Sequence, residues 1–335
     1  MSFKDIIGQK KAISILLESL KRGKIFSSYI FLGKEGVGRK LTALELAKAV
    51  NCLKLSDNFE TCEKCLSCYK INKGCSPDLQ LIEPLKGVIT IGQIRELQRE
   101  VNLKPLESKR KIYIIEQAEK MTAEASNSLL KTIEEPPPYA LIILICSNLE
   151  AILPTIISRC QLLKFGLINT PTLREALALS KVNLKEDKIE LISKLAQGSI
   201  GKALKLVSDK EYFVRREKIF DFLIHLSPGK SDGYSFARLG EVIKKNNDNI
   251  EEVLEIILFW YRDIFLAKER VQEYTVNIDK LGIIKEKSEV YSREELRDIL
   301  DYLTQIPEFL DRKVNKQLIL ENLYLKMAGV EYCLQ

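Results

Sequence analysis

A short glycine-rich segment, residues 33–40, constrains the fold of this chain most. It reads Gly-Lys-Glu-Gly-Val-Gly-Arg-Lys and directly follows the apolar run Tyr29–Leu32. A helical pattern of apolar residues then extends from Leu41 to Val50. A strand, a glycine loop and a helix in this order form a phosphate-binding loop, whose backbone N–H groups surround a phosphate at the start of the helix. The segment therefore predicts an α/β fold built on a parallel sheet.

The side chains that such a loop needs for catalysis are missing here. A working loop reads G-x-x-x-x-G-K-[ST], in which the lysine contacts phosphates and the hydroxyl binds Mg²⁺. The glycines Gly33, Gly36 and Gly38 are present, but Arg39 replaces the lysine and Lys40 replaces the Ser or Thr. A lysine cannot bind Mg²⁺, and its charge repels the ion. We therefore expect a degenerate loop and no functional ATP site in this chain.

The rest of the chain extends this fold and adds a helical region. Short apolar runs at 79–82, 112–115, 141–146 and 162–165 alternate with helical patterns, which predicts a parallel sheet covered on both faces. After about residue 167 only helical patterns remain. A length of 335 residues also exceeds the size at which a single core stops growing, about 250–300 residues. We therefore expect more than one domain.

Charge and hydropathy narrow the classes of protein to which the chain can belong. The sequence contains no apolar run of about 18 residues and no signal peptide, so we expect a cytoplasmic protein without a membrane segment. The net charge of +6 suits contact with nucleic acid but does not require it.

Four cysteines, Cys52, Cys62, Cys65 and Cys68, have the spacing C-x₉-C-x₂-C-x₂-C. Four thiolates at such spacing can form a closed tetrahedral site for structural zinc, and Cys75 is a substitute ligand by position. Free thiols, a redox pair and a DNA-binding zinc module are the competing interpretations. Disulfides are not expected, because they are rare in cytosolic proteins.

Residues in two further segments relate to nucleotide chemistry. Glu116 and Gln117 follow the run 112–115, where a nucleotide motor carries an Asp for Mg²⁺ and a Glu that activates water. Glu116 can still reach a metal but Gln117 cannot act as a base; an ordinary polar strand end gives the same pattern. Arg159, in the tripeptide Ser-Arg-Cys, is either a solvated residue or an arginine finger that contacts a phosphate held by a neighbouring subunit.

Four segments outside the glycine loop carry a specific family resemblance: Phe3–Gln9, Ser126–Pro137, Ile152–Gln161 and Asn315–Glu321. With them, and with the position of its cysteine insert, the chain resembles over nearly its whole length the delta-prime family of clamp-loader subunits of bacterial DNA polymerase III, which are AAA+ proteins. The long segments are highly specific, whereas the glycine loop alone is a weak signal.

The resemblance implies three domains. A RecA-like AAA+ domain would occupy residues 1–167, with the zinc-binding insert at about 52–77. A small helical lid would follow at 168–208, and an all-α collar at 209–335 would oligomerise. Working members carry a sensing arginine in the lid, at the position that Gly201 occupies here.

The resemblance also implies a non-catalytic accessory subunit of the DNA polymerase holoenzyme. It would join gamma/tau motor subunits and a delta subunit in a pentameric ring that places a sliding clamp on primed DNA. Arg159 would act in trans on the ATP site of a neighbouring motor, and zinc would be the cofactor of this chain. Two alternatives stay open: an active ATPase in which Arg39 or Lys40 replaces the missing lysine and Glu116 holds Mg²⁺, and a zinc-dependent DNA-binding module.

Overall fold

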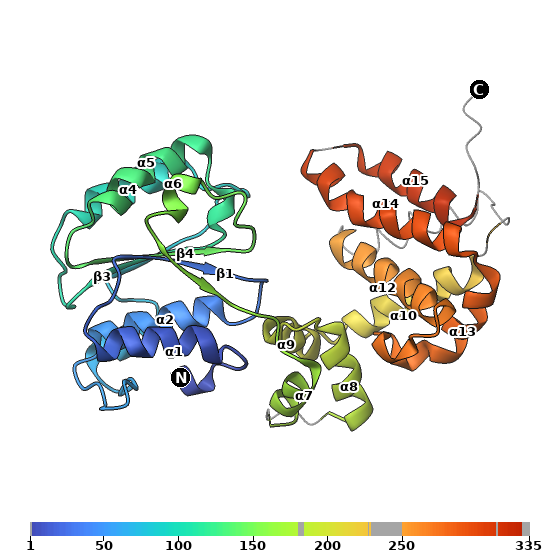
Figure 1. Ribbon diagram of the computed structural model, residues 1–335, viewed down its shortest axis with the longest axis horizontal. Helices are drawn as coiled ribbons and strands as arrows, with labels where there is room; N and C mark the ends of the chain where they lie inside the picture. Colours follow the sequence, from blue (N-terminus) through green and yellow to red (C-terminus); the bar gives the residue numbers. More distant parts are fainter. Residues whose placement is uncertain (1, 180–183, 227, 229–249, 313, 330–335) are drawn as a thin grey trace. The chain divides into compact units, whose positions relative to one another are not determined.

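A computed structural model describes residues 2–179, 184–226, 228, 250–312 and 314–329, and the chain forms two compact units (Figure 1). The first unit comprises Met1–Lys181 and Ala196–Leu204, and the second comprises Val182–Leu195 and Lys205–Gln335. The domain boundaries expected at residues 167 and 208 stay predictions. Among the described residues, the helices include none whose length and apolar character would let it span a membrane.

The first unit is built on the parallel sheet that the sequence predicts. Its five strands lie in the order β2-β3-β4-β1-β5. Their bounds are β1 Ser28–Leu32, β2 Leu79–Ile82, β3 Lys111–Ile115, β4 Ala140–Cys146 and β5 Gln161–Lys164. All 7 residues of the central strand β4 are buried, as expected for a strand covered on both faces.

Helices cover both faces of this sheet. The helices of the first unit before residue 180 are α1 Lys10–Lys21, α2 Arg39–Asn51, α3 Leu66–Asn72, α4 Ile91–Val101, α5 Ala123–Glu134, α6 Pro154–Ile157 and α7 Thr170–Leu179, with short 3₁₀ turns η1 Phe3–Asp5 and η2 Ala118–Lys120. Helices α1 and α2 lie on one face, and α4, α5 and α6 lie on the other (Figure 1). Alternate residues of β3 serve the two resulting cores: Ile112 and Ile114 pack toward α1 and α2, while Tyr113 and Ile115 pack on the opposite face.

The carboxyl ends of the central strands place the site residues. Because β3, β4 and β1 are parallel neighbours, Glu116 after β3 and the glycine loop after β1 lie at the same edge of the sheet. This edge is where open α/β sheets bind ligands. The side chain of Thr122 caps the start of helix α5. The helix ends at Glu134, because the prolines that begin at Pro136 cannot continue it.

The second unit is helical throughout the residues that the structure describes. Its helices are α8 Glu186–Leu195, α10 Tyr212–His225, α12 Ile250–Lys268, α13 Leu281–Val290, α14 Arg293–Asp311 and α15 Lys316–Met327, with 3₁₀ turns η3 Gln272–Tyr274 and η4 Ile278–Lys280; α9, Ile200–Ser208, begins in the first unit and ends in the second. Trp260 in α12 is buried, and its ring centroid lies 5.0 Å from that of Phe220 in α10. The only tryptophan of the chain therefore packs a core.

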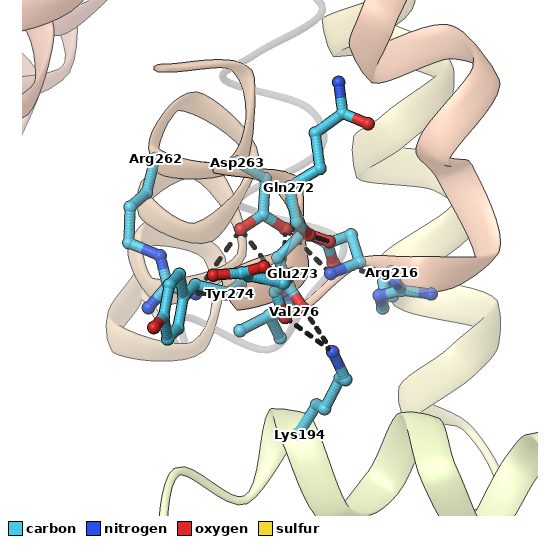
Figure 2. A network of polar contacts seen from close by, with 10 residues as sticks. Lys194, Arg216, Arg262, Asp263, Gln272, Glu273, Tyr274 and Val276 are labelled. Carbon is cyan, nitrogen blue, oxygen red and sulfur yellow. Dashed lines mark hydrogen bonds and ion pairs between the residues drawn. The ribbon is translucent and has the colours of Figure 1, made fainter. Parts of the chain in front are cut away.

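A buried carboxylate fixes the segment that follows α12. Asp263 accepts hydrogen bonds from the backbone N–H of Val276 and of Asn277, at 3.0 and 2.7 Å (Figure 2). From α8, Lys194 Nζ donates to the carbonyl of Thr275 over 3.0 Å. These contacts provide hydrogen-bond partners for the backbone of residues 275–277, which lie outside regular secondary structure. We therefore assign a structural role to these contacts.

Candidate functional site

The glycine loop has the backbone that its sequence predicts. It connects β1 to α2, and its residues Gly36 and Gly38 have φ values of +75° and +104°, a region that favours glycine. Gly33 is needed for a different reason: a Cβ at this position would lie 2.5 Å from the carbonyl oxygen of Phe165. Each of the three glycines therefore permits a backbone conformation or a close contact that a side chain would prevent.

Arg39 is buried beside this loop, with 8% of its surface exposed. Its Nη1 has no hydrogen-bond partner among the described residues. Burial lowers the pKa of the guanidinium, while the charges of Glu119 and Glu35 act in the opposite direction. An arginine side chain remains protonated in proteins, so Arg39 places a fixed positive charge at the carboxyl edge of the sheet.

Lys40 pairs with two carboxylates instead of pointing away from the loop. Its Nζ lies 2.9 Å from Oε1 of Glu83 and 2.5 Å from Oε1 of Glu116. Burial acts to lower the pKa of Lys40, but the two carboxylates outweigh it and raise the pKa above its ordinary value. The ammonium group therefore stays charged and neutralises Glu116, the acid that the sequence suggests as a metal ligand. Gln117, which follows, adopts a left-handed backbone with φ of +49°.

Arg159 follows the short helix α6 and holds its guanidinium at the surface. Nη2 lies 3.0 Å from Oε1 of Glu134, at the end of α5. Nη1 donates to the carbonyl of Thr155 over 3.0 Å and to Oγ of Ser158 over 3.3 Å. The side chain is 41% exposed. Its charge is therefore oriented by neighbours yet accessible to another molecule, which is what an arginine acting in trans requires.

The four predicted cysteines come together in space. The Sγ atoms of Cys52, Cys62, Cys65 and Cys68 all lie within 4.8 Å of one another. Cys52 follows α2, and Cys65 caps the start of α3, so helix ends hold two of the four thiols. Cys75 is outside this group; its exposed thiol donates to the carbonyl of Lys70 over 3.6 Å.

The hydrogen bonds and charges of this cluster fit a metal. Backbone N–H groups of Cys62, Cys65 and Cys68 point at the Sγ atoms of Cys52, Cys62 and Cys65, at 3.5, 3.3 and 3.5 Å. Burial raises the pKa of Cys52 and of Cys68, whereas the backbone N–H of Lys64 lowers the pKa of Cys62 to about 6. Four thiolates this close repel one another, and a divalent cation removes that repulsion. Zinc, with Zn–S bonds of about 2.3 Å, suits this donor set.

A buried ion cluster that the sequence did not reveal supports the cysteine insert. Lys48 of α2 is 1% exposed, and its Nζ lies 2.7 Å from Glu45 and 2.6 Å from Glu63. Glu63 also accepts hydrogen bonds from Thr61 and from Asn72. The sequence offered one local signal for this cluster: Glu45 and Lys48 are three positions apart in α2, a spacing at which oppositely charged side chains can pair. This cluster ties the insert to the helix that follows the glycine loop.

Comparison with known proteins points to one family. Two family models match: "DNA polymerase III, delta subunit" at residues 8–169, and "DNA polymerase III, delta subunit, C terminal" at residues 210–328. The DNA polymerase III subunit delta′ of Bacillus subtilis is 29% identical over 320 residues, which cover 95% of this chain and 96% of that protein. The gamma subunit of Buchnera aphidicola subsp. Acyrthosiphon pisum is 30% identical, over 73% of this chain and 68% of that protein. A solved structure, a gamma-subunit-related protein of Thermotoga maritima, is 19% identical with a TM-score of 0.48, covering 93% of this chain and 98% of that chain.

Proposed function

Because the chain belongs to the delta-prime family of DNA polymerase III clamp-loader subunits, we propose that it does not hydrolyse ATP itself and that it offers Arg159 to a neighbouring motor subunit. Its role in the clamp loader follows from membership of the family. That this chain lacks ATP hydrolysis and assists a neighbouring motor subunit is our proposal. Its main support is the contact of Lys40 with Glu116 and Glu83.

The Lys40 contact supports the loss of ATP hydrolysis for an electrostatic reason. In a nucleotide motor, a hydroxyl after the loop and an acid after β3 hold Mg²⁺ against the phosphates. Here an ammonium group fills the space between these two positions and cancels the charge of Glu116. Mg²⁺ would have to displace a covalently attached cation, and Gln117 offers no carboxylate to activate water.

The exposure of Arg159 supports its action in trans. A guanidinium stabilises charge on a transferring phosphoryl group because it is planar, always protonated and able to donate two parallel hydrogen bonds. An arginine finger needs no nucleotide in its own chain. Arg159 can therefore complete the ATP site of an adjacent motor while the loop of this chain is degenerate.

The partners follow from the same proposal. We place the chain in a pentameric ring with gamma/tau motor subunits and a delta subunit, in the cytoplasm. The ring would use ATP to load a sliding clamp onto primed DNA. Zinc held by Cys52, Cys62, Cys65 and Cys68 would be structural, because a closed site with four protein ligands leaves no position for a substrate.

The test of the finger is a reconstituted ring that contains Arg159→Ala. We expect hydrolysis at the adjacent ATP site to fall by about 10³-fold or more, the range measured for arginine fingers, while the ring still assembles. Arg22→Ala is the matched control, because Arg22 is also an exposed arginine in an ion pair with a glutamate. An unchanged clamp-loading rate in the Arg159→Ala ring would refute the assignment.

The rival function is an active ATPase, and the purified chain distinguishes it. We expect neither Mg²⁺-dependent ATP binding nor turnover, with or without primed DNA. Turnover that disappears in Lys40→Ala would show that Lys40 serves the missing lysine's role and that the chain is a motor. The observation that favours this rival is Nη1 of Arg39, a buried donor that has no hydrogen-bond partner in the part of the chain that the structure describes.

A further inference from the structure

The turn between two of the predicted zinc ligands adopts a backbone conformation that its sequence does not favour. Glu63 lies between Cys62 and Cys65 and has a φ of +57°, in the left-handed region that disfavours residues with a Cβ. The backbone N–H of Cys65 donates to Sγ of Cys62 over 3.3 Å, so this turn sets how the two thiols lie relative to each other. A residue keeps such a conformation only where its surroundings impose it, which directs attention to the contacts of the Glu63 side chain.

Both carboxylate oxygens of Glu63 accept hydrogen bonds from side chains of the cysteine insert. Oγ1 of Thr61 donates to Oε1 over 2.7 Å, and Nδ2 of Asn72 donates to Oε2 over 2.9 Å. Thr61 directly precedes Cys62, and Asn72 is the last residue of α3, the helix that Cys65 caps. The side chain of Glu63 thus connects the residue before the cysteine turn to the end of the helix after it.

Lys48 joins the same carboxylate to helix α2. Its Nζ lies 2.6 Å from Oε1 of Glu63 and 2.7 Å from Oε1 of Glu45, which precedes it in the helix. Lys48 and Glu45 are buried, whereas the side chain of Glu63 is 32% exposed. A buried ammonium is costly unless its charge is paired, so the cation that holds Glu63 does not turn to solvent. Helix α2 therefore meets the site twice, through Cys52 after its last residue and through Lys48 about one turn earlier.

We propose that Lys48 and Glu63 are positioning residues of the metal site. Their ion pair holds the turn of Cys62 and Cys65 in the geometry that the metal needs, so that the metal does not have to order the turn as it binds. A site that is ordered beforehand binds more tightly, because ordering it upon binding costs free energy. The proposal rests on the structural zinc site proposed above, and it names residues outside the four cysteines on which the affinity of that site depends.

Titration of the reduced full chain with Co²⁺ tests this role, because Co²⁺ in a tetrahedron of four thiolates absorbs visible light and zinc displaces it. In the wild type we expect one Co²⁺ per chain. Lys48→Met and Glu63→Ala should each raise the dissociation constant of Co²⁺ by about 10- to 100-fold, the range found when residues around the ligands of a metal are changed. The absorption spectrum at saturation should stay that of the wild type, because the four cysteines are unchanged.

Lys70→Met is the control for these variants. Lys70 lies in α3, within the same insert, and pairs with the carboxylate of Glu107, but this ion pair does not involve the cysteine turn. We expect the wild-type affinity for Co²⁺ with this variant. Because Lys48 and Glu63 act through one contact, the variant that carries both substitutions should bind Co²⁺ about as tightly as the weaker of the two single variants.

Wild-type affinity in Glu63→Ala would overturn the positioning role. This variant decides the question if Lys48→Met, which removes the cation beside the buried Glu45, does not fold. An equal loss of affinity in Lys70→Met would also overturn it, because any loosening of the insert would then weaken the site. A wild type that binds neither Co²⁺ nor zinc would refute the zinc site itself, whereas variants that bind as tightly as a metal-binding wild type refute only the positioning role.

Discussion

Lys40 Nζ lies 2.5 Å from Oε1 of Glu116, so the residue after the loop's arginine is paired with the first acid after β3. The same ammonium lies 2.9 Å from Glu83. Lys40 of α2 and the two acids that directly follow β2 and β3 thus form an ion cluster at the edge of the sheet where a nucleotide motor holds its metal. This ion cluster is the observation on which we base the proposal that the chain does not hydrolyse ATP itself.

Replacing Lys40 by serine removes this internal cation and restores the hydroxyl of the loop. We expect Lys40→Ser to bind Mg²⁺ weakly through Glu83 and Glu116, because two unpaired carboxylates and a hydroxyl are the oxygen ligands that Mg²⁺ takes. Titration calorimetry with MgCl₂ measures this. Lys40→Arg, which keeps the charge, should give no heat. Equal behaviour of the two variants would contradict our interpretation. Stability should change by about 1 kcal/mol or less, because the lysine is partly exposed.

Glu134 competes with any phosphate for Arg159. An exposed ion pair contributes about 0–1 kcal/mol, and the guanidinium gives up this contact when it turns to a ligand. We therefore expect Glu134→Gln to lower the ATP concentration needed for half-maximal clamp loading by the reconstituted ring, by up to about fivefold. Glu135→Gln, its neighbour in sequence, is the control. A higher requirement for ATP in Glu134→Gln would mean that Glu134 positions the arginine instead of holding it back.

Zinc binding by the cysteine insert is open to direct measurement. Native mass spectrometry should find one zinc ion per chain, and Cys68→Ser should lose it, because Cys68 is buried within the group of four. Structural zinc sites contribute directly to folding, so we expect proteases to cleave between residues 52 and 75 after chelation. Cys75→Ser should keep the metal. Loss of zinc in Cys75→Ser would show that Cys75 is a ligand and that the cluster rearranges.

The stability of the first unit should depend on the ionisation of Asp78. This residue is buried, which by itself raises its pKa, but the backbone N–H groups of Glu107, Leu106 and Ser108 outweigh burial and hold the pKa below its ordinary value. A carboxyl with a depressed folded pKa stabilises the fold above its unfolded pKa of about 3.9, and this contribution is lost as the pH falls through the folded value.

Asp78→Asn provides the corresponding measurement. We expect a loss of about 2 kcal/mol in the free energy of unfolding at pH 7, the scale of hydrogen bonds to a charged group. Denaturant titrations at pH 7 and at pH 3 should show that the wild type loses its advantage over the variant as the acid is protonated. A constant difference between the two proteins across this range would show that the charge of Asp78 is not what stabilises the loop at 106–108.

Much of the fold could be predicted because its signals are local. The strand at 79–82 and the helix at 91–101 lie where the apolar patterns put them, since burial of one or both faces imposes a period on the sequence. The cysteine group was also predictable from a local pattern: three of its members lie within seven residues, Cys62 to Cys68, and the fourth precedes Cys62 by ten positions. The substitutions of Arg39 and Lys40 also show in the sequence alone, because the pattern of a working loop is contiguous.

The partners of these residues were not predictable, because each contact joins segments that the sequence separates. Pairing of Lys40 with Glu83 depends on the neighbouring positions of α2 and β2, and pairing of Arg159 with Glu134 depends on the packing of α6 against α5. The spacing of apolar residues in the sequence predicts helices and strands, but it does not indicate which side chains from different elements come into contact. Gly201 is the clearest case. The sequence shows only that no arginine stands at this position, whereas in the structure a Cβ at Gly201 would lie 2.8 Å from Cα of Gly36.

The sequence by itself therefore determined the kind of fold, the family, the degenerate loop and the cysteine set, all of which are written in short contiguous patterns. Only the tertiary structure decided which contacts these residues make: Lys40 pairs with Glu83 and Glu116, Arg159 pairs with Glu134, and Ser199 bonds to the glycine loop. The physical reason is that hydrogen bonds and ion pairs act over about 3 Å in space, while the residues that form them are 25 to 164 positions apart in the chain.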